Sequence, residues 1–306
     1  MKSASGFELY VILSDQCNFR CSHCINSSGP NAKSIVHTPQ DIETLISTIH
    51  STPSIKILHF SGGEPTLQLD LIAQIQNRIK NIDLRYAMTT NGSFALKTDV
   101  KFRILNEMKF HEMIFSYDKH HAPFIKKENL CSLLQELKSY PIQTAVNLVY
   151  RKIEEIAEGK EFVDLGIPVH PTRLVTGGRE SAQKNLNSSA ADRESDLFDP
   201  LALQRSCPSF SDEHRRNSLE KVVYIAGRGF TPCCGPIAFD RLREDAFVYS
   251  SQFESYASIP LYQELRTGNF DFHFKKRGID ASRLKLPTAC DYCKMAFCQT
   301  SSEGVA

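Results

Sequence analysis

The sequence predicts an α/β protein, namely a partial (β/α)6 barrel followed by a small cysteine-rich extension. Between Phe7 and about Val175, short β-rich runs alternate six times with longer segments. This alternation is typical of parallel strands joined by right-handed crossovers. Beyond residue 200, cysteines recur among loop-forming residues, and this composition predicts a second, smaller unit.

Six apolar runs are predicted to be strands because they are rich in residues that fit a pleated surface. These runs cover residues 7–13, 55–61, 84–90, 112–117, 143–150 and 169–175. In barrels of this kind, functional side chains lie on the loops at the carboxyl ends of the strands. We therefore expect the site on the loops that follow these runs.

Five helical patterns lie between the strands, at residues 38–51, 69–80, 97–109, 128–139 and 152–166. Thr38 followed by Pro39 is a typical helix start, with threonine as the N-cap and proline at the first helical position. Together the strands and helices predict a TIM-type barrel that closes only in part.

The chain is predicted to have three parts: a barrel core at 1–176, a polar linker at 177–199 and the extension at 200–306. The linker segment is rich in Ser and Asn and nearly free of large apolar residues. In the extension, residues 221–234 (KVVYIAGRGFTPCC) predict a hairpin with a Gly-Arg-Gly turn. The first strand begins at about residue 7, so we expect no separate peptide-recognition domain before it.

Composition excludes several classes of protein. The 306 residues carry 36 Lys+Arg and 35 Asp+Glu, a net charge of +1 without a basic stripe, which argues against nucleic acid as a partner. No apolar run approaches the roughly 20 residues of a membrane span. The N-terminal residues also lack the features of a signal peptide. We therefore expect a cytoplasmic protein without a membrane partner.

Ten cysteines need an explanation, because in a reducing compartment clustered cysteines more often bind metal or do redox chemistry than form disulfides. Cys131 lies in a helical pattern and is expected to be a small core residue. Three others, Cys17, Cys21 and Cys24, follow the first strand as C-x3-C-x2-C. Such a loop can bind three irons of a [4Fe–4S] cluster, which usually has four cysteine ligands, and would leave one iron open. Zinc would need a fourth ligand, and the adjacent His23 is the alternative.

A second motif, Gly62-Gly63-Glu64-Pro65, comes directly after the second strand. Two glycines let the backbone approach a ligand closely, and Glu64 offers a carboxylate to an ammonium group. Alone, this motif is also compatible with a simple tight turn.

Together, CNFRCSHC and GGEP resemble the radical S-adenosylmethionine (SAM) superfamily over about residues 7–175. The resemblance implies that Cys17, Cys21 and Cys24 are the catalytic cluster ligands and that S-adenosyl-L-methionine chelates the fourth iron. An external one-electron reductant of the flavodoxin or ferredoxin type would drive reductive cleavage of SAM. The resulting 5′-deoxyadenosyl radical would abstract a substrate hydrogen.

The resemblance also implies the remaining cofactor-binding residues. Gly62, Gly63, Glu64 and Pro65 would bind the methionine part, and His23 would pack beside the adenine unless it is an exposed loop histidine. Further candidates are Thr90, Asn91, Ser116, Asp118, Asn147 and Val175. Thr90 and Asn91 are equally compatible with an Asn-Gly turn, and Asp118 with a solvated turn. His120 and His121 could serve the substrate or transfer protons, but surface histidines are the commoner outcome and are expected here.

Six cysteines near the C-terminal end form the second constellation: Cys207, Cys233, Cys234, Cys290, Cys293 and Cys298. Spacing alone leaves zinc and an iron–sulfur cluster open. The pattern is similar to the SPASM and shorter twitch extensions of radical SAM enzymes, and implies one auxiliary [4Fe–4S] cluster held by Cys207, Cys234, Cys290, Cys293 and Cys298. Cys233 and Cys234 would point in opposite directions, so the ligand of this pair stays open. Cys298 is a fourth ligand, a spare thiol or a hydrogen donor.

The function that the resemblance implies is that of a radical SAM oxidoreductase that modifies a peptide, by crosslinking or epimerisation, with help from the auxiliary cluster. A dehydrogenase of a small metabolite is the alternative within the enzyme class. A non-catalytic metal-cluster-binding regulator is the alternative outside it.

Overall fold

The computed structural model describes residues 6–174, 178–179, 219–239, 244–249, 253–266, 270–276, 278, 280 and 289–297. Its strands form one eight-stranded sheet in the order β6-β5-β4-β3-β2-β1-β7-β8. The first six are β1 (Gly6–Ile12), β2 (Ile55–Ser61), β3 (Arg85–Thr90), β4 (Glu112–Ser116), β5 (Gln143–Tyr150) and β6 (Val169–Arg173), each parallel to the next. The predicted partial barrel is confirmed.

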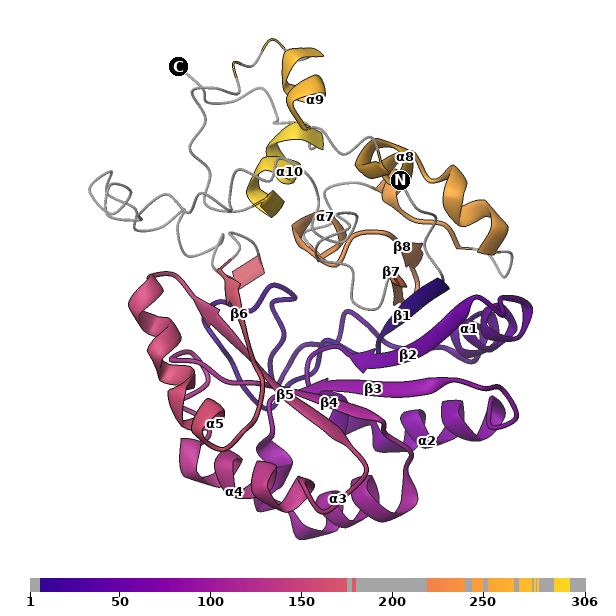
Figure 1. Ribbon diagram of the computed structural model, residues 1–306. Helices are drawn as coiled ribbons and strands as arrows, with labels where there is room; N and C mark the ends of the chain where they lie inside the picture. Colours follow the sequence, from indigo (N-terminus) through magenta and orange to yellow (C-terminus); the bar gives the residue numbers. More distant parts are fainter. Residues whose placement is uncertain are drawn as a thin grey trace.

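Helices α1 (Pro39–Ser51), α2 (Leu69–Arg78), α3 (Thr98–Phe102), α4 (Lys127–Leu137) and α5 (Lys160–Asp164) cover the outer face of the curved sheet (Figure 1). Helix α1 starts as predicted, with a capping box between Thr38 and Asp41. The helical pattern at 152–166 is mostly a 3-10 helix, Ile153–Gly159, before α5. Gly159 packs so closely that an added Cβ would lie 3.0 Å from Val169.

Several shorter segments complete the barrel region. The pattern at 97–109 is α-helical only in α3 and continues as a π-helical turn, Arg103–Glu107. Short 3-10 helices lie at Pro65–Gln68 and Ser93–Leu96, and in the extension at Glu244–Ala246 and Phe253–Ser258. None of the described helices is long and apolar enough to cross a membrane.

The two faces of the sheet differ in chemistry. Leu9, Val11, Leu58 and Phe60 belong to the apolar core shared with the helices. Successive side chains of a strand point to opposite faces, so Glu8 and its alternating neighbours lie on the inner face. The helices therefore bury an apolar face, and the inner face is left for a site.

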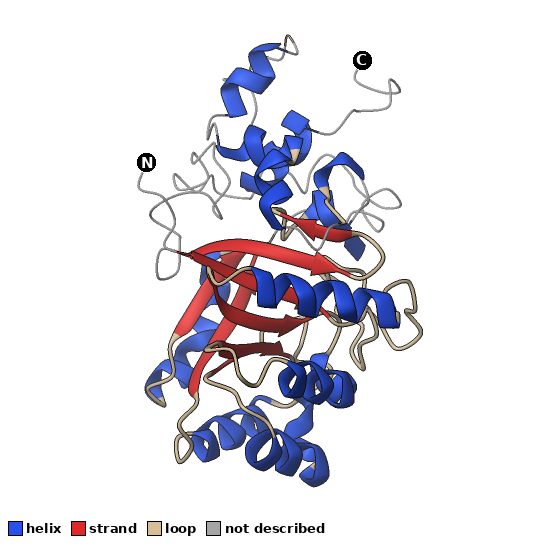
Figure 2. Ribbon diagram, turned by 90° about the vertical axis from the view of Figure 1, so that its right-hand side faces the viewer, coloured by secondary structure: helices blue, strands red, loops and turns tan. Residues whose placement is uncertain are grey.

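The extension joins the barrel through the sheet. Strand β7 (Leu219–Ile225) pairs parallel with β1, and β8 (Gly229–Thr231) returns antiparallel, which confirms the hairpin. The sequence did not indicate that this hairpin extends the barrel sheet. Helices α7 (Pro236–Phe239), α8 (Pro260–Arg266), α9 (Phe270–Lys276) and α10 (Ala289–Phe297) gather beside the hairpin, at the top of Figure 2.

One buried carboxylate ties the hairpin to α1. Asp41 is 2% exposed, and its Oδ1 accepts hydrogen bonds from the Gly227 amide (2.9 Å) and the Tyr249 hydroxyl (2.9 Å). The Tyr224 hydroxyl donates to the Asp41 carbonyl at 2.8 Å. The residue that caps α1 thus also anchors the extension.

Candidate active site

The three-cysteine loop lies at the carboxyl end of β1. Cys17 and Cys21 are each 8% exposed, and Cys24 is half-buried. Burial, reinforced by the neighbouring thiols, raises the pKa of Cys17 to about 11 and that of Cys21 to about 12. Three thiolates in one buried loop would need a cation to balance their charge, so the donor set suits a positively charged metal centre.

Backbone and amide groups already point at the sulfurs. The Phe19 amide donates to Cys17 Sγ at 3.3 Å, and the Ser28 amide donates to Cys24 Sγ at 3.3 Å. Asn91 Nδ2 approaches Cys17 Sγ at 3.7 Å. Hydrogen bonds of this kind orient metal-binding thiolates and tune iron–sulfur clusters.

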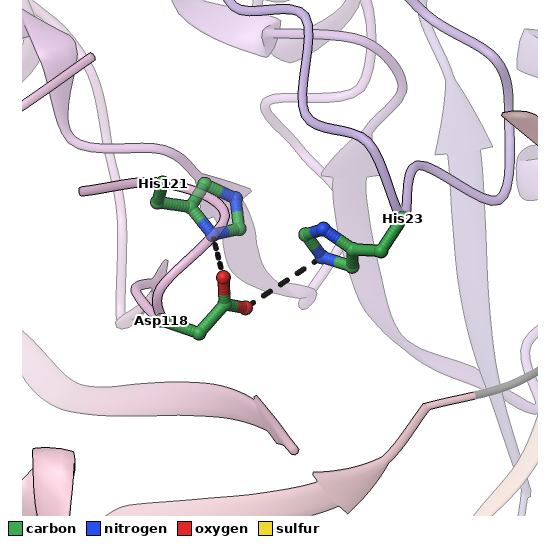
Figure 3. Close-up of side chains that lie close together, drawn as sticks. All are labelled: His23, Asp118 and His121. Carbon is green, nitrogen blue, oxygen red and sulfur yellow. Dashed lines mark hydrogen bonds and ion pairs between the residues drawn. The ribbon is translucent and has the colours of Figure 1, made fainter. Parts of the chain in front are cut away.

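The arrangement does not suit a single zinc ion. Thiolates about 2.3 Å from one zinc would lie roughly 4 Å apart. Among the described residues, His23, Asp118 and His121 have potential metal-binding atoms within 4.8 Å of one another. The three cysteines do not form such a group. His23, the fourth ligand that zinc would need, faces Asp118 instead (Figure 3).

The Gly62-Gly63-Glu64 turn packs directly on the cysteine loop. The Gly63 amide donates to the Ser14 carbonyl at 2.7 Å, and the Glu64 amide donates to the Gln16 carbonyl at 2.9 Å. A Cβ on Gly63 would lie 2.0 Å from the Gln16 oxygen. Glycine is required here because the two backbones touch.

Glu64 joins the loops after β2 and β3. Its carboxylate is 1% exposed and accepts from the Thr66 amide and hydroxyl, the Thr90 hydroxyl (2.7 Å) and the Asn91 amide (2.8 Å). Burial raises the pKa of Glu64, and these hydrogen bonds oppose the rise. The carboxylate is thus already bound by its own chain, while Pro65 is buried behind it.

Asn91, in the segment 89–93 (TTNGS), both forms the Asn-Gly turn and contacts the cysteine loop. Its Oδ1 accepts from the Ser93 amide at 2.9 Å, and Gly92 has φ +72°, so an Asn-Gly turn is present. Its Nδ2 also donates to Asn18 Oδ1 at 2.9 Å, on the cysteine loop. The turn therefore delivers a side chain to the site.

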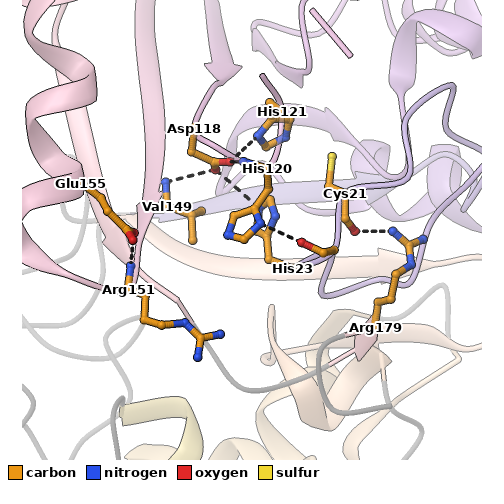
Figure 4. A network of polar contacts seen from close by, with 10 residues as sticks. Cys21, His23, Asp118, His120, His121, Val149, Arg151, Glu155 and Arg179 are labelled. Carbon is orange, nitrogen blue, oxygen red and sulfur yellow. Dashed lines mark hydrogen bonds and ion pairs between the residues drawn. The ribbon is translucent and has the colours of Figure 1, made fainter. Parts of the chain in front are cut away.

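The loop after β4 supplies a histidine–aspartate network. Asp118 is 1% exposed, and its carboxylate contacts His121 Nδ1 at 3.0 Å, His23 Nε2 at 3.6 Å and the His120 amide at 2.8 Å (Figures 3 and 4). Burial would raise the pKa of Asp118, but the His121 hydrogen bond and the neighbouring histidines hold it at about 2. Burial lowers the pKa of His23 to about 4.

The expectation that His121 is a surface residue is wrong, since it is 7% exposed, and His120 is half-buried. Of the two alternatives for His23, the exposed loop histidine does not hold, because its side chain is 11% exposed. The His120 ring packs against the His23 ring in a tilted arrangement, with centroids 4.5 Å apart and planes 34° apart, and its Nδ1 forms a hydrogen bond with Ser22 Oγ at 2.7 Å. The network thus fastens the β4 loop to the cysteine loop.

Ser116, the last residue of β4, is paired with Asn147 in the middle of β5, and both are half-buried. Asn147 alternates with Val146 of the helix-facing core, so it is on the inner face. Val175, Cys207 and Cys298 lie outside the described residues, and of the predicted linker only residues 178–179 are described.

Buried polar atoms around the loop have no partner in the described part of the chain. They are Ser14 Oγ, His23 Nδ1, Asn26 Oδ1 and Ser28 Oγ. Buried polar groups are normally hydrogen-bonded, so several buried polar atoms without a partner beside three thiols indicate a place for a polar ligand. This observation fits a cluster with a polar cofactor bound to it.

Arg179 is a site residue that the sequence did not indicate. Its amide donates to the Cys24 carbonyl at 3.1 Å, and its guanidinium donates to the carbonyls of Cys21 and Ser28 (Figure 4). Gly178 touches the same loop, where a Cβ would lie 2.4 Å from the Cys24 oxygen. The sequence signal that could have pointed to this segment is the pair Gly177-Gly178 after the sixth strand, which is like the pair Gly62-Gly63 after the second.

Among the C-terminal cysteines, Cys290 lies near the turn that carries Cys233 and Cys234. Cys290 Sγ would lie 3.6 Å from a Cβ on Gly235, so α10 meets the turn that carries Cys233 and Cys234. Cys233 packs against the apolar core and accepts from the Gly235 amide at 3.3 Å, whereas Cys234 is exposed. Cys293 is 8% exposed. Cys131, as predicted, is a half-buried residue packed on the core.

Comparison with known proteins identifies the family. The model of the radical SAM superfamily matches residues 11–170, which hold both motifs and most of the parallel strands. The chain belongs to the radical SAM superfamily. It is therefore a radical SAM enzyme, and the family implies S-adenosylmethionine and a [4Fe–4S] cluster.

Relatives extend the similarity beyond that region. The putative peptide biosynthesis protein YydG of Bacillus subtilis (strain 168) is 25% identical over 258 residues, covering 80% of this chain and 74% of the relative. The probable GTP 3′,8-cyclase of Thermococcus kodakarensis is 36% identical over 85 residues, 28% of this chain and 27% of the relative.

Two solved structures share the fold. Native anSMEcpe with bound AdoMet and Cp18Cys peptide superposes with a TM-score of 0.51 at 13% identity, covering 95% of this chain and 96% of that one. BtrN in complex with AdoMet and 2-DOIA gives a TM-score of 0.50 at 18% identity, covering 88% and 91%. At these identities the likeness concerns the fold alone.

Proposed function

We propose that this radical SAM enzyme modifies a peptide, by crosslinking or epimerisation, with help from one auxiliary [4Fe–4S] cluster. The observation that carries the proposal is the similarity to YydG, named as a putative peptide biosynthesis protein, over 80% of this chain. That similarity reaches well beyond residues 11–170, where the superfamily model ends. The GTP cyclase similarity covers only 28% of the chain.

Cys17, Cys21 and Cys24 would hold the catalytic cluster, and S-adenosylmethionine would bind the open iron. The bound pair supplies a 5′-deoxyadenosyl radical when an external reductant provides an electron. Gly62 and Gly63 would present their backbone to the methionine part. Glu64 positions the loop carrying Thr90 and Asn91, because its carboxylate binds both residues.

Further cofactor contacts come from the other strand ends. His23 would face the adenine, with its buried Nδ1 as an acceptor and Asp118 fixing its ring. Ser116 and Asn147 are neighbours on β4 and β5 and would reach the ribose. Val175 would line the adenine from the sixth strand.

An auxiliary cluster would be bound by Cys234, Cys290 and Cys293, together with Cys207 and Cys298. The contact between Cys290 and the turn at Gly235 supports it, since this turn carries Cys233 and Cys234. Zinc at these cysteines is an outcome that metal analysis distinguishes. A second redox centre suits a peptide radical, because it can take up the electron left on the substrate.

The test is a reaction of the anaerobically reconstituted protein with SAM, a strong reductant and short peptides encoded beside its gene. We expect 5′-deoxyadenosine, faster with a substrate peptide, and a mass change in that peptide. Stimulation by a small alcohol but by no peptide would favour the dehydrogenase alternative instead. No 5′-deoxyadenosine from fully loaded protein would contradict the radical chemistry itself.

A further inference from the structure

The inner face of the sheet carries a buried polar cluster to which no role has been given: Glu8, Tyr10, His59, Thr89 and Lys221. Each alternates along its strand with a residue of the helix-facing core, such as Leu9, Phe60 or Met88, so all five lie on the inner face. Glu8 is 1% exposed and His59 is fully buried. Thr89, Tyr10 and Lys221 are half-buried.

Three of these side chains form a continuous hydrogen-bonded chain across β1, β2 and β3. Glu8 Oε1 lies 2.9 Å from His59 Nδ1, and His59 Nε2 lies 2.7 Å from Thr89 Oγ1. An ionised carboxylate only accepts, so it places the histidine proton on Nδ1 and leaves Nε2 to accept from the threonine hydroxyl. A carboxylate, an imidazole and a hydroxyl in this order form an acid–base chain.

The three hydrogen-bonded side chains follow the strands toward their carboxyl ends. His59 is level with Tyr10 on β1 and with Ala87 on β3, while Glu8 lies two residues lower and Thr89 two residues higher. The next residue, Thr90, donates to Glu64 in the turn that would bind SAM. The hydroxyl end thus lies one residue from the carboxyl end of β3, the edge of the sheet that carries the cysteine loop and the Glu64 turn, and the carboxylate end lies farther from this edge.

The remaining two residues hold the imidazole and balance the charge. The Tyr10 ring stacks on His59 with centroids 4.1 Å apart and planes 15° apart. Lys221 Nζ lies 5.1 Å from the centre of the Tyr10 ring, on the side of β7. In the described part of the chain, the titratable groups seen in contact with His59 are Glu8 and Tyr10 from β1, and Lys221 of β7 lies against the Tyr10 ring.

A purely structural role explains this cluster poorly. Barrel interiors are usually filled by layers of branched apolar side chains. Apolar residues indeed lie around the cluster, with Ile57, Ala87 and Leu219 as one group and Ile12, Val223 and Ile225 in another. Burying ionisable groups between such layers costs stability that apolar residues would not, and proteins tend to keep them where chemistry needs them.

We propose that Glu8, His59 and Thr89 form a proton relay that serves the substrate radical, which presupposes the radical function proposed above. The substrate would carry an N–H or O–H on the attacked carbon, as the α-carbon of any peptide residue except proline does. Such a proton becomes more acidic once the neighbouring carbon is a radical. As the substrate N–H or O–H bond breaks, its proton goes to the Thr89 oxygen and the Thr89 proton goes to His59 Nε2. The bonding electron pair stays on the substrate, and Glu8 stabilises the imidazolium.

The first test needs no substrate. In reconstituted protein carrying ¹⁵N-labelled histidine, nuclear magnetic resonance reports the protonation of each imidazole nitrogen, and His59→Gln assigns the His59 signals. We expect the proton of the His59 imidazole on Nδ1 rather than on Nε2, and a changed Nε2 signal in Thr89→Val. An imidazole that carries its proton on Nε2, or that is doubly protonated in the reconstituted protein, cannot accept from Thr89 and overturns the relay.

The second test uses a peptide that accelerates 5′-deoxyadenosine formation. Thr89→Val and His59→Gln should lower modified peptide about 100-fold relative to 5′-deoxyadenosine, since hydrogen abstraction precedes the proton step. Thr89→Ser should restore the yield, and Thr48→Val, which removes a buried hydroxyl from α1, should leave it unchanged. Product and 5′-deoxyadenosine falling together, or full yield from Thr89→Val, would contradict the proposal. If no peptide stimulates the enzyme, the proposed function fails, while the imidazole measurement still decides the relay.

Discussion

The two cysteine groups of this protein differ in how they are held. The loop at Cys17–Cys24 is fixed by side chains from the ends of β2, β3 and β4 and by Arg179. The group at Cys233, Cys234, Cys290 and Cys293 lies on short helices and a turn, with Cys234 exposed. The first is part of the sheet edge, whereas the second is attached beside it.

This difference indicates a division of labour. Reactive geometry must be held within a fraction of an ångström, and loops anchored to strand ends supply that precision. A centre that only receives an electron tolerates looser support. We therefore expect the first group to be indispensable for SAM cleavage and the second to matter only for the later conversion of the substrate radical into product.

Replacing Cys21 by alanine should have the largest effect. Two remaining thiolates cannot hold a cluster with one open iron, so 5′-deoxyadenosine formation should fall at least about 1,000-fold. Iron, sulfide and product are measured in the same preparation, with Cys131→Ala as the matched cysteine control. Wild-type turnover by Cys21→Ala would show that the loop is not the catalytic centre.

Replacing Cys290 and Cys293 together by alanine separates the two groups. If they bind an auxiliary cluster, iron per chain should fall by about half. In the same variant, 5′-deoxyadenosine formation should stay within about threefold of wild type, and modified peptide should disappear. Unchanged iron would refute the auxiliary cluster, and a loss of zinc instead would identify a structural metal site.

How far the sequence predicts these two regions depends on the range of the interactions. Strands β1 to β6, the cysteine loop and the Gly62–Gly63 turn are encoded in local patterns, and they were predictable. The burial of His120 and His121 was not, because it depends on Ser22 and His23, about 100 positions earlier in the chain. The pairing of β7 with β1 was missed for the same reason.

Asp41→Asn should loosen the attachment between the two regions. The carboxylate accepts from Gly227, Tyr249 and Thr38, so its loss should lower the free energy of unfolding by about 1–2 kcal/mol. Burial would raise the pKa of Asp41, but the Thr38 and Gly227 hydrogen bonds lower it to about 2. Because the pKa of Asp41 is lower in the folded protein than in the unfolded chain, the ionised carboxylate stabilises the fold at pH values above the unfolded pKa of about 4. This stabilisation is lost as the pH falls from about 4 toward 2.

Urea unfolding at about pH 7 and about pH 3 measures both effects of this substitution. The difference in unfolding free energy between wild type and Asp41→Asn should become smaller at the lower pH, since Asp41 of the unfolded wild-type chain is largely protonated there while the folded protein still holds it ionised. Asp70→Asn is the control, because the Asp70 side chain is 93% exposed beside Arg103. A gap that stays constant with pH would mean that the charge of Asp41 contributes nothing.

Arg179→Gln should have the smallest effect, and it sharpens the comparison at the first cysteine group. The guanidinium closes the loop by binding the carbonyls of Cys21 and Ser28, whereas Gly62, Glu64 and Asp118 hold the loop from the sheet. Since most of the support remains, iron release to a chelator should quicken only about fivefold, the equivalent of about 1 kcal/mol. Arg103→Gln, which breaks an exposed ion pair, should release iron at the wild-type rate. Loss of the cluster as complete as in Cys21→Ala would show instead that this segment, and not the sheet edge, holds the loop in place.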